Sequence, residues 1–259
     1  MDLGVAGRRA IVCASSQGLG RACARALAAE GVDVVVNGRD PEEVDKAVAE
    51  IAASGTGQVI GVAADLTEPR GRDALLAACP EPDILVLNNR GPKPGLLGEV
   101  TDDDFEVALD LHYRAPIALV RAVLPGMRAR KWGRIVAITS AMVTSPNEGM
   151  ITSVGARAGL TGVLKSLSFA AAADGVTINQ LLPERFATQR QIDNANRTVE
   201  RDGVTFEQAW AAQAATIAAK RHGDPTELGA MCAFLCSEHA GFVSGMNVHL
   251  DGGSYRGIV

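Results

Sequence analysis

The sequence has few of the features that mark several common protein classes. Its 259 residues include only 4 histidines, and the formal net charge is −5. Because the histidines show no metal-ligand spacing, we expect no metal site. No run of about 18 uncharged apolar residues occurs, so we expect no membrane span. The acidic balance argues against nucleic acid as a partner.

The cysteines are also few, and they form no compact framework. Their odd number is typical of reduced thiols in a cytosol. The first ten residues lack the apolar core of a signal peptide. We therefore expect a cytoplasmic protein. The cysteines are Cys13, Cys23, Cys79, Cys232 and Cys236.

What the sequence does contain is a glycine turn between a short apolar run and an alanine-rich helix, within residues 10–31. Such a turn presents backbone N–H groups and the positive end of a helix to an anion. Glycines there allow close approach of a pyrophosphate. The turn is therefore a candidate dinucleotide site, although a plain strand-to-helix turn is the alternative. Its candidate contact residues are Ala14, Ser16, Gln17, Gly18, Leu19 and Gly20.

Strand-like apolar runs alternate with helical segments along the chain. This alternation predicts an α/β fold: one doubly wound parallel sheet of about seven strands, with helices on both faces. The expected strands are 10–12, 32–36, 59–63, 84–87, 134–138, 176–182 and 246–250. The expected helices are 21–30, 41–54, 68–78, 102–130, 153–173 and 226–236.

No linker, repeat or low-complexity segment divides the chain, so we expect a single domain over residues 1–259. The polar stretch 186–222 has no strand pattern. We expect it to form one or two mobile helices that cover the site and select the substrate.

Residues just after the expected strands are candidates for cofactor binding, because ligands sit beyond the carboxyl ends of such sheets. Arg39 lies 21 positions after Gly18, where an arginine accepts a 2′-phosphate, so NADP(H) is favoured over NAD(H). The alternative is a solvated Arg39 beside a helix cap at Asp40. Asp65 and Leu66 follow the third strand and are placed to meet the adenine.

These residues resemble the short-chain dehydrogenase/reductase family, and most of all members similar to 3-oxoacyl-acyl-carrier-protein reductase. The resemblance covers essentially the whole chain and implies a single-domain Rossmann fold. The matching motifs include the glycine turn and the serine after the fifth expected strand, Ser140. They also include the segments of residues 88–91, 179–188 and 251–253. Beyond the residues named above, the resemblance assigns cofactor contacts to Asn89, Gly91, Arg157, Pro183 and Thr188.

The catalytic positions depart from the family pattern. The family's Tyr-x-x-x-Lys falls on Ser153 and Arg157, and its relay asparagine falls on His112. In the family, the tyrosine exchanges a proton with the substrate oxygen and the lysine holds the ribose. Ser153 is shorter and a weaker acid, whereas Arg157 keeps the positive charge and could still bind the ribose.

Other side chains could compensate for the missing tyrosine. Ser140 matches the family's serine and can donate to a carbonyl oxygen. His112 suits proton transfer near neutral pH, although a buried, hydrogen-bonded histidine is an equal alternative. Glu184 could act on the substrate or simply pair with Arg185 or Arg90. Tyr255, near the C-terminus, is a weaker candidate donor from a neighbouring subunit.

The resemblance leads to one main functional hypothesis and two alternatives. The main hypothesis is an NADP(H)-dependent oxidoreductase that interconverts a small-molecule ketone and a secondary alcohol with an altered proton relay. The first alternative is a cofactor-binding protein without redox turnover, acting as a scaffold or sensor. The second is a lyase or isomerase that uses His112 and Glu184. The resemblance also implies a homotetramer, or otherwise a homodimer, through the helices 102–130 and 153–173.

Overall fold

The protein, described by a computed structural model over residues 1–258, is built on one parallel sheet of seven strands. The spatial order is β3-β2-β1-β4-β5-β6-β7. The predicted doubly wound fold is therefore confirmed, and each expected strand is present. The strands are β1 Arg9–Val12, β2 Asp33–Gly38, β3 Val59–Ala63, β4 Ile84–Leu87, β5 Gly133–Ile138, β6 Val176–Pro183 and β7 Asn247–Leu250.

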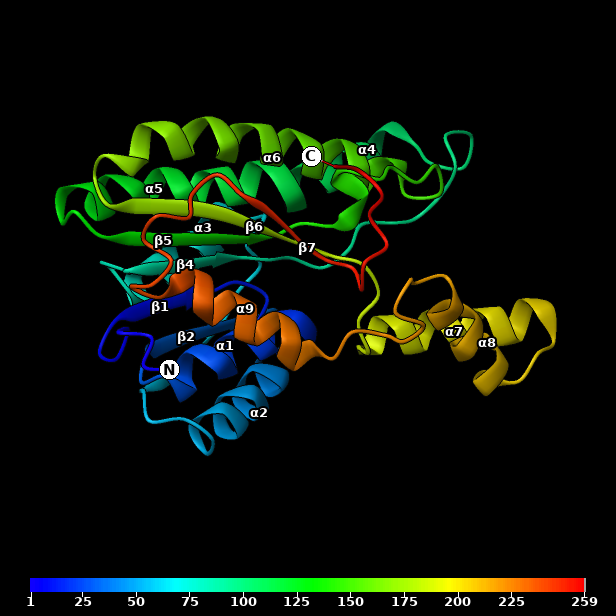
Figure 1. Ribbon diagram of the computed structural model, residues 1–259, viewed down its shortest axis with the longest axis horizontal. Helices are drawn as coiled ribbons and strands as arrows, with labels where there is room; N and C mark the ends of the chain where they lie inside the picture. Colours follow the sequence, from blue (N-terminus) through cyan, green and yellow to red (C-terminus); the bar gives the residue numbers. More distant parts are fainter. Residues whose placement is uncertain (259) are drawn as a thin grey trace.

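Helices cover both faces of the sheet (Figure 1). Residues of α1, α2 and α9 pack in one apolar cluster, and residues of α3, α5 and α6 pack in another. Every residue of β4 and β5 is buried between them, as expected for a parallel sheet with both faces covered. The helices are α1 Gly18–Ala29, α2 Pro41–Ala52, α3 Pro69–Ala78, α4 Asp102–Leu109, α5 Ala115–Ala129, α6 Ile151–Ala172, α7 Gln189–Asp202, α8 Phe206–Ala215 and α9 Pro225–Cys236.

The strand order reverses at β1, which lies between β2 and β4. The connection after β1 therefore runs to one side of the sheet, and the connection after β4 runs to the other. In folds of this type ligands bind at such a divergence, beyond the carboxyl ends of the two strands, and we call this position the crevice. The glycine turn after β1 and the loop after β4 flank it.

The predicted helix over 102–130 is helical without a break over 102–129, but it is not a regular α-helix throughout. A π-helical turn, Asp110–Arg114, separates α4 from α5, and the Ala115 N–H donates to the Asp110 carbonyl, five residues back. Pro116 has no N–H to donate to residue 112, so one α-helical hydrogen bond is absent at this place in any case. The wider turn brings His112 to the buried side of the helix.

The helices α7 and α8 extend away from the layered body, beyond the carboxyl end of β6 (Figure 1). They occupy most of the predicted 186–222 stretch, which we call the lid. A bridge between Phe186 and Gly223 joins the two ends of the lid. Across residues 1–258, no helix combines the length and apolar character needed to cross a bilayer.

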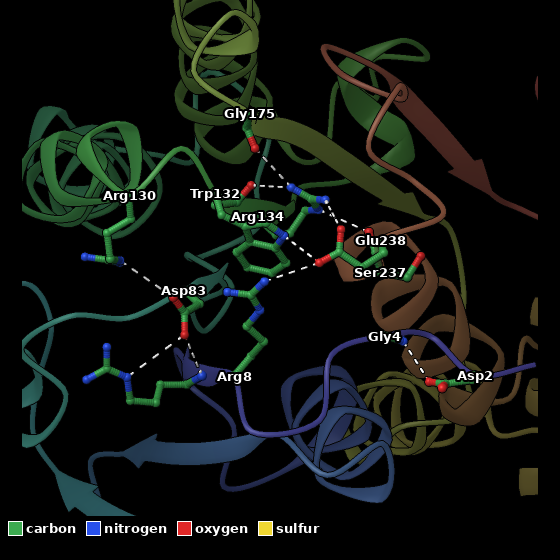
Figure 2. A network of polar contacts seen from close by, with 12 residues as sticks. Asp2, Gly4, Arg8, Asp83, Arg130, Trp132, Arg134, Gly175, Ser237 and Glu238 are labelled. Atoms are coloured by element: carbon green, nitrogen blue, oxygen red, sulfur yellow. Dashed lines mark hydrogen bonds and ion pairs between the residues drawn. The ribbon is translucent and has the colours of Figure 1, made fainter.

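At the opposite edge of the sheet, where strands begin, charged side chains form a closed network (Figure 2). The Trp132 ring lies between two guanidinium groups, 3.8 Å from Arg8 and 4.4 Å from Arg134. Trp132 Nε1 and Arg8 both donate to Glu238. Nearby, Asp83 accepts from the Arg9 N–H and lies 3.7 Å from Arg130 Nε. This network ties the N-terminal segment, β1, β5 and the end of α9 together.

Candidate active site and cofactor cradle

The glycine turn after β1 is held by side-chain amides from two neighbouring strands. Asn37, in β2, accepts from the Ala14 N–H at 3.1 Å, and Asn88, after β4, donates to the Ala14 carbonyl at 3.0 Å. Ala14 itself has a φ of 45°, in the left-handed region. A Cβ at Gly20 would lie 2.3 Å from the Ala14 carbonyl oxygen, so only glycine fits there.

Sequence reasoning did not find these holding roles of Asn37 and Asn88. Asn37 is 1% exposed, and its amide also donates to the carbonyl groups of Val62 and Ala64. It therefore joins β2, β3 and the turn. The available signal was a polar side chain at the end of an otherwise apolar strand, because a buried amide has to find partners.

Two helix N-termini meet at the mouth of the crevice. The N-cap residues Gln17 of α1 and Thr188 of α7 make no side-chain capping bond, so N–H groups in both first turns stay unpaired. A Cβ at Gly18 would lie 3.9 Å from Thr188 Cγ2, which shows how close the two turns are. In contrast, α2, α4, α8 and α9 are capped by Asp40, Thr101, Thr205 and Asp224.

The remaining turn residues serve mainly to support this arrangement. Ser16 is buried against β2, since a Cβ at Gly38 would lie 2.6 Å from Ser16 Oγ. Leu19 packs against the apolar cluster below α1. What the turn offers to a ligand is therefore its backbone N–H groups.

At the far end of the crevice, Arg39 is exposed and makes no hydrogen bond or ion pair within residues 1–258. Burial raises the pKa of Asp65, but its bonds to the Thr67 hydroxyl and N–H, with Arg39 and Arg90 nearby, lower it overall. Leu66 is buried in the second apolar cluster, so its side chain is not available to a ligand. The Asp40 side chain accepts from the Glu42 N–H and so caps α2, which is the helix cap considered in the sequence analysis. Arg39 takes no part in this cap.

Arg157 is the centre of the predicted catalytic cluster. It is buried, and four of its five N–H groups bond to the protein. Its Nε donates to Ser153 Oγ at 3.1 Å, and one terminal nitrogen lies 3.3 Å from His112 Nε2. The other terminal nitrogen donates to the carbonyl oxygens of Ile138 and Thr139, at the end of β5. Arg157 therefore points into the protein rather than into the crevice.

The charge of Arg157 is unusual because, among residues 1–258, no carboxylate forms an ion pair with it. Burial, together with the positive charge of Arg190, lowers the pKa of the Arg157 guanidinium to about 9. Each hydrogen bond that it makes goes to a neutral oxygen or nitrogen. The site consequently holds an uncompensated positive charge beneath the crevice.

His112 is a neutral base in this arrangement. A guanidinium can only donate, so His112 Nε2 accepts from Arg157 and the ring proton lies on Nδ1. Burial, with the charges of Arg157 and Arg190, holds the pKa of His112 well below its ordinary 6.5, although a hydrogen bond with the Arg90 backbone opposes this. From the sequence, His112 could be either a proton-transfer group or a buried, hydrogen-bonded histidine. The environment of His112 in the structure is that of the second reading.

The other predicted site residues occupy the surroundings of this cluster. Ser140 lies two residues after β5, and its Oγ accepts from the Met142 N–H at 3.2 Å, which leaves the hydroxyl proton available. Ser153 is 3% exposed, so it lies below the surface of the crevice. Asn89 donates to the Leu111 carbonyl and thereby holds the π-helical turn. Pro183 ends β6 and is buried there.

The two weaker catalytic candidates, Glu184 and Tyr255, each contact a neighbouring side chain outside the cluster around Arg157. Glu184 lies 3.8 Å from Arg185, so the ion-pair alternative accounts for it. Tyr255 stacks on His249 with ring centroids 4.1 Å apart, next to the last strand.

One residue that the sequence did not single out reaches into the crevice from the lid. Arg190, in the first turn of α7, lies against the loop after β4, where a Cβ at Gly91 would be 1.6 Å from its Nη1. The signal that could have found it is a cation two residues after Thr188, at a helix end that already favours anions.

Comparisons with known proteins match this architecture over nearly the whole chain. The family described as Enoyl-(Acyl carrier protein) reductase matches residues 13–255. Human dehydrogenase/reductase SDR family member 4 is 31% identical over 255 residues, which is 96% of this chain and 88% of that protein. The chain belongs to the short-chain dehydrogenase/reductase family. It is thus a member of a family of oxidoreductases.

Two further relatives show the range of this family. A 3-oxoacyl-[acyl-carrier-protein] reductase of Vibrio cholerae is 29% identical, over 96% of this chain and 98% of its own. The crystal structure of L-sorbose reductase from Gluconobacter frateurii, complexed with NADPH and L-sorbose, superposes with a TM-score of 0.94 at 28% identity over the full length of both chains. The predicted resemblance to 3-oxoacyl-acyl-carrier-protein reductases is confirmed.

Proposed function

We propose that this protein is an NADP(H)-dependent oxidoreductase that interconverts a ketone and a secondary alcohol with an altered proton relay. The observation that carries the proposal is the cradle formed by the glycine turn and the two uncapped helix N-termini at Gln17 and Thr188. Unpaired N–H groups of this kind suit a pyrophosphate. The NADPH complex of the related L-sorbose reductase supports the same assignment.

The side chains along the crevice fit the rest of a phosphorylated dinucleotide. Arg39 is free to bond a 2′-phosphate in the bidentate manner that guanidinium groups favour. Asp65 and the backbone of Leu66 border the adenine end, while Asn89, Gly91 and Pro183 border the reaction end. Cofactor bound in this cradle would supply a hydride to a carbonyl carbon.

The chain's own residues then have to stabilise and protonate the substrate oxygen. Ser140 has its hydroxyl proton available and donates it in a hydrogen bond to that oxygen. The uncompensated charge of Arg157 stabilises the negative charge that develops there. Since His112 is neutral and its Nε2 lone pair is occupied by Arg157, water supplies the proton that completes the alcohol.

A direct test measures NADPH binding by cofactor fluorescence and NADPH oxidation with a panel of ketones and aldehydes. We expect saturable binding and carbonyl-dependent oxidation. Tight NADPH binding with no turnover across the panel would contradict the proposed oxidoreductase activity. Absence of NADPH binding would contradict the proposed cofactor site at the glycine turn.

The second candidate, cofactor binding without turnover, is favoured by one observation. Ser153 is buried and bonded to Arg157, so neither residue presents the tyrosine-like donor of the family. The double variant Ser153→Tyr with Arg157→Lys separates the two functions. Turnover that rises from nothing by several orders of magnitude indicates a decayed site, whereas loss of existing turnover shows that the native pair is part of the catalytic machinery.

A further inference from the structure

The Arg190 side chain crosses the crevice from the lid. Its helix, α7, begins beside the glycine turn, since a Cβ at Gly18 would lie 3.9 Å from Thr188 Cγ2. Two residues later, the Arg190 guanidinium lies on the loop after β4, where a Cβ at Gly91 would be 1.6 Å from Nη1 and 2.4 Å from Cζ. The side chain therefore spans the distance between the two segments that flank the crevice.

The contact between Arg190 and Gly91 is one of packing. Within residues 1–258, the Arg190 guanidinium makes no hydrogen bond and no ion pair. Its five N–H groups are therefore available to a ligand, and no hydrogen bond is broken when the guanidinium leaves Gly91. A dinucleotide that lies between the glycine turn and the loop after β4 meets this side chain and displaces it from Gly91.

The surroundings of Arg190 are unfavourable for a cation. Partial burial, and the positive charge of Arg197 two turns further along the helix, lower the pKa of Arg190. Arg190 in turn lowers the pKa of His112 and that of Arg157, so it lies within electrostatic reach of both. A cation that is partly removed from water gains more from a nearby anion than a fully solvated one does.

The place nearest to Arg190 that suits an anion is the pair of uncapped helix N-termini at Gln17 and Thr188. Arg190 belongs to the first turn of α7, so it stands at one of these two N-termini. Backbone N–H groups and the positive ends of two helices favour a phosphate there. A free guanidinium adds the forked donor geometry that matches phosphate oxygens.

The other arginines near the crevice are placed differently. Arg157 spends most of its N–H groups on protein oxygens and on His112. Arg39 and Arg90 lie near Asp65 at the adenine end, where both lower the pKa of that carboxyl group. Arg190 is therefore the side chain best placed to contact an anion at the two helix N-termini.

We propose that Arg190 binds the pyrophosphate of the cofactor and so holds the lid to the dinucleotide. This inference rests on the proposed oxidoreductase function and adds a cofactor-binding residue to it. Because NADPH and NADH share the pyrophosphate, Arg190 strengthens the binding of both, whereas Arg39 acts on the 2′-phosphate alone.

The proposed contact also couples the lid to the cofactor. The lid helices α7 and α8 pack mainly on each other, and the bridge between Phe186 and Gly223 joins the two ends of the lid. Arg190 lies just beyond this bridge, so an anion that fixes its guanidinium also fixes the first turn of α7. Cofactor binding should therefore slow hydrogen exchange in that turn.

The test uses isothermal titration of the full-length protein with four ligands. NADPH, NADH and ADP-ribose all contain the pyrophosphate, whereas adenosine 2′-monophosphate contains the 2′-phosphate without it. The variants are Arg190→Gln and Arg190→Lys, with Arg201→Gln as the matched control. Arg201 lies at the other end of the same helix and donates to Asp202 at 2.6 Å.

We expect Arg190→Gln to weaken NADPH, NADH and ADP-ribose by the same factor, about tenfold to hundredfold, because it removes a charge-assisted contact. Arg190→Lys keeps the charge without the fork and should weaken them less. Adenosine 2′-monophosphate should bind Arg190→Gln as it binds the wild-type protein, and Arg201→Gln should change none of the four affinities. NADPH should slow hydrogen exchange at the start of α7 less in Arg190→Gln than in the wild-type protein.

Three outcomes would overturn the proposal. Unchanged binding of NADPH and ADP-ribose to Arg190→Gln would show that the arginine makes no cofactor contact. Tighter binding would show that its guanidinium only obstructs the crevice. Weakening confined to NADPH and adenosine 2′-monophosphate would assign Arg190 to the 2′-phosphate. If the wild-type protein binds none of the dinucleotides, the proposed oxidoreductase function fails and this inference with it, whereas the three outcomes above leave that function standing.

Discussion

Arginines are paired at one edge of the sheet, where the strands begin, and unpaired at the opposite edge, where the strands end. At the edge where the strands begin, Arg8 and Arg134 enclose Trp132 and face Glu238, and Arg130 faces Asp83 (Figure 2). At the edge where the strands end, the arginines at positions 39, 90, 157 and 190 form no ion pair within residues 1–258.

This difference separates folding from function. Paired and stacked guanidinium groups hold segments together, and their charge is satisfied inside the protein. Exposed guanidinium groups without such bonds, as at Arg39, contribute little to folding and stay available to an anion. Substitutions at the first edge should therefore change stability and leave ligand affinity intact. Substitution of an exposed arginine at the second edge should do the reverse, whereas Arg157 is buried and bonded within the protein.

The largest effect is expected at the beginning edge, from Trp132→Ala. The substitution removes two cation–π contacts and the bond to Glu238, and it should lower the free energy of unfolding by about 3 kcal/mol. Denaturant unfolding measures this loss, and NADPH affinity of the folded protein should not change. Trp210→Ala, in the lid, is the control and should cost less. An equal loss at both positions would contradict the special role of this edge.

The next effect is expected at the ending edge, from Arg39→Gln. Loss of a bidentate contact with the 2′-phosphate should weaken NADPH binding roughly tenfold to hundredfold, with NADH binding and thermal stability unchanged. Fluorescence titration of both cofactors measures this. Arg25→Gln, on the exposed side of α1, is the matched control. Equal weakening of NADPH binding and NADH binding would show that Arg39 does not contact the 2′-phosphate.

A smaller effect is expected from the pH dependence of stability. The pKa of His112 is held well below 6.5 in the folded protein, so the unfolded chain takes up the proton first as the pH falls. The contribution of His112 is complete above pH about 6.5. It should decrease by about 1 kcal/mol as the pH falls from about 7 to about 5.5. Unfolding of the wild-type protein and His112→Gln at several pH values measures it, and the variant should show the shallower decline.

The smallest effect is expected at the glycine turn. Ala14 has a φ of 45°, which is strained for a residue with a Cβ. Ala14→Gly should therefore raise the free energy of unfolding by about 0.5 kcal/mol, after the entropy that glycine adds to the unfolded chain. The same substitution at Ala26, inside α1, should lower it by about 1 kcal/mol. Destabilisation by both would show that the turn tolerates alanine without strain.

The sequence was sufficient to predict the strands, because β-rich apolar runs between helical segments leave few arrangements for a parallel sheet. It was not sufficient for the helix over 102–130, where Pro116 could have been tolerated at the beginning of an α-helix. What decides the π-helical turn is tertiary contact, including the Asn89 bond to the Leu111 carbonyl. Local patterns do not contain that information.

The candidate site shows the same division. Positions at strand ends could be predicted because they follow from topology. The direction of Arg157 could not, because its partners come from β5, from the same helix and from His112. The approach of Arg190 to Gly91 was also beyond sequence reasoning, because it depends on how the lid lies relative to the loop after β4.

The π-helical turn also sets the rotational phase between the helices on either side of it. Each residue of an α-helix turns the chain by about 100°, so one residue more or less in this turn would rotate α5 by that angle relative to α4. Deleting one residue there would keep a helix but swing the buried side chains of α5, such as Leu119 and Val123, away from the sheet. The position is therefore one where length matters more than residue type, and insertions and deletions should be tolerated less well there than substitutions.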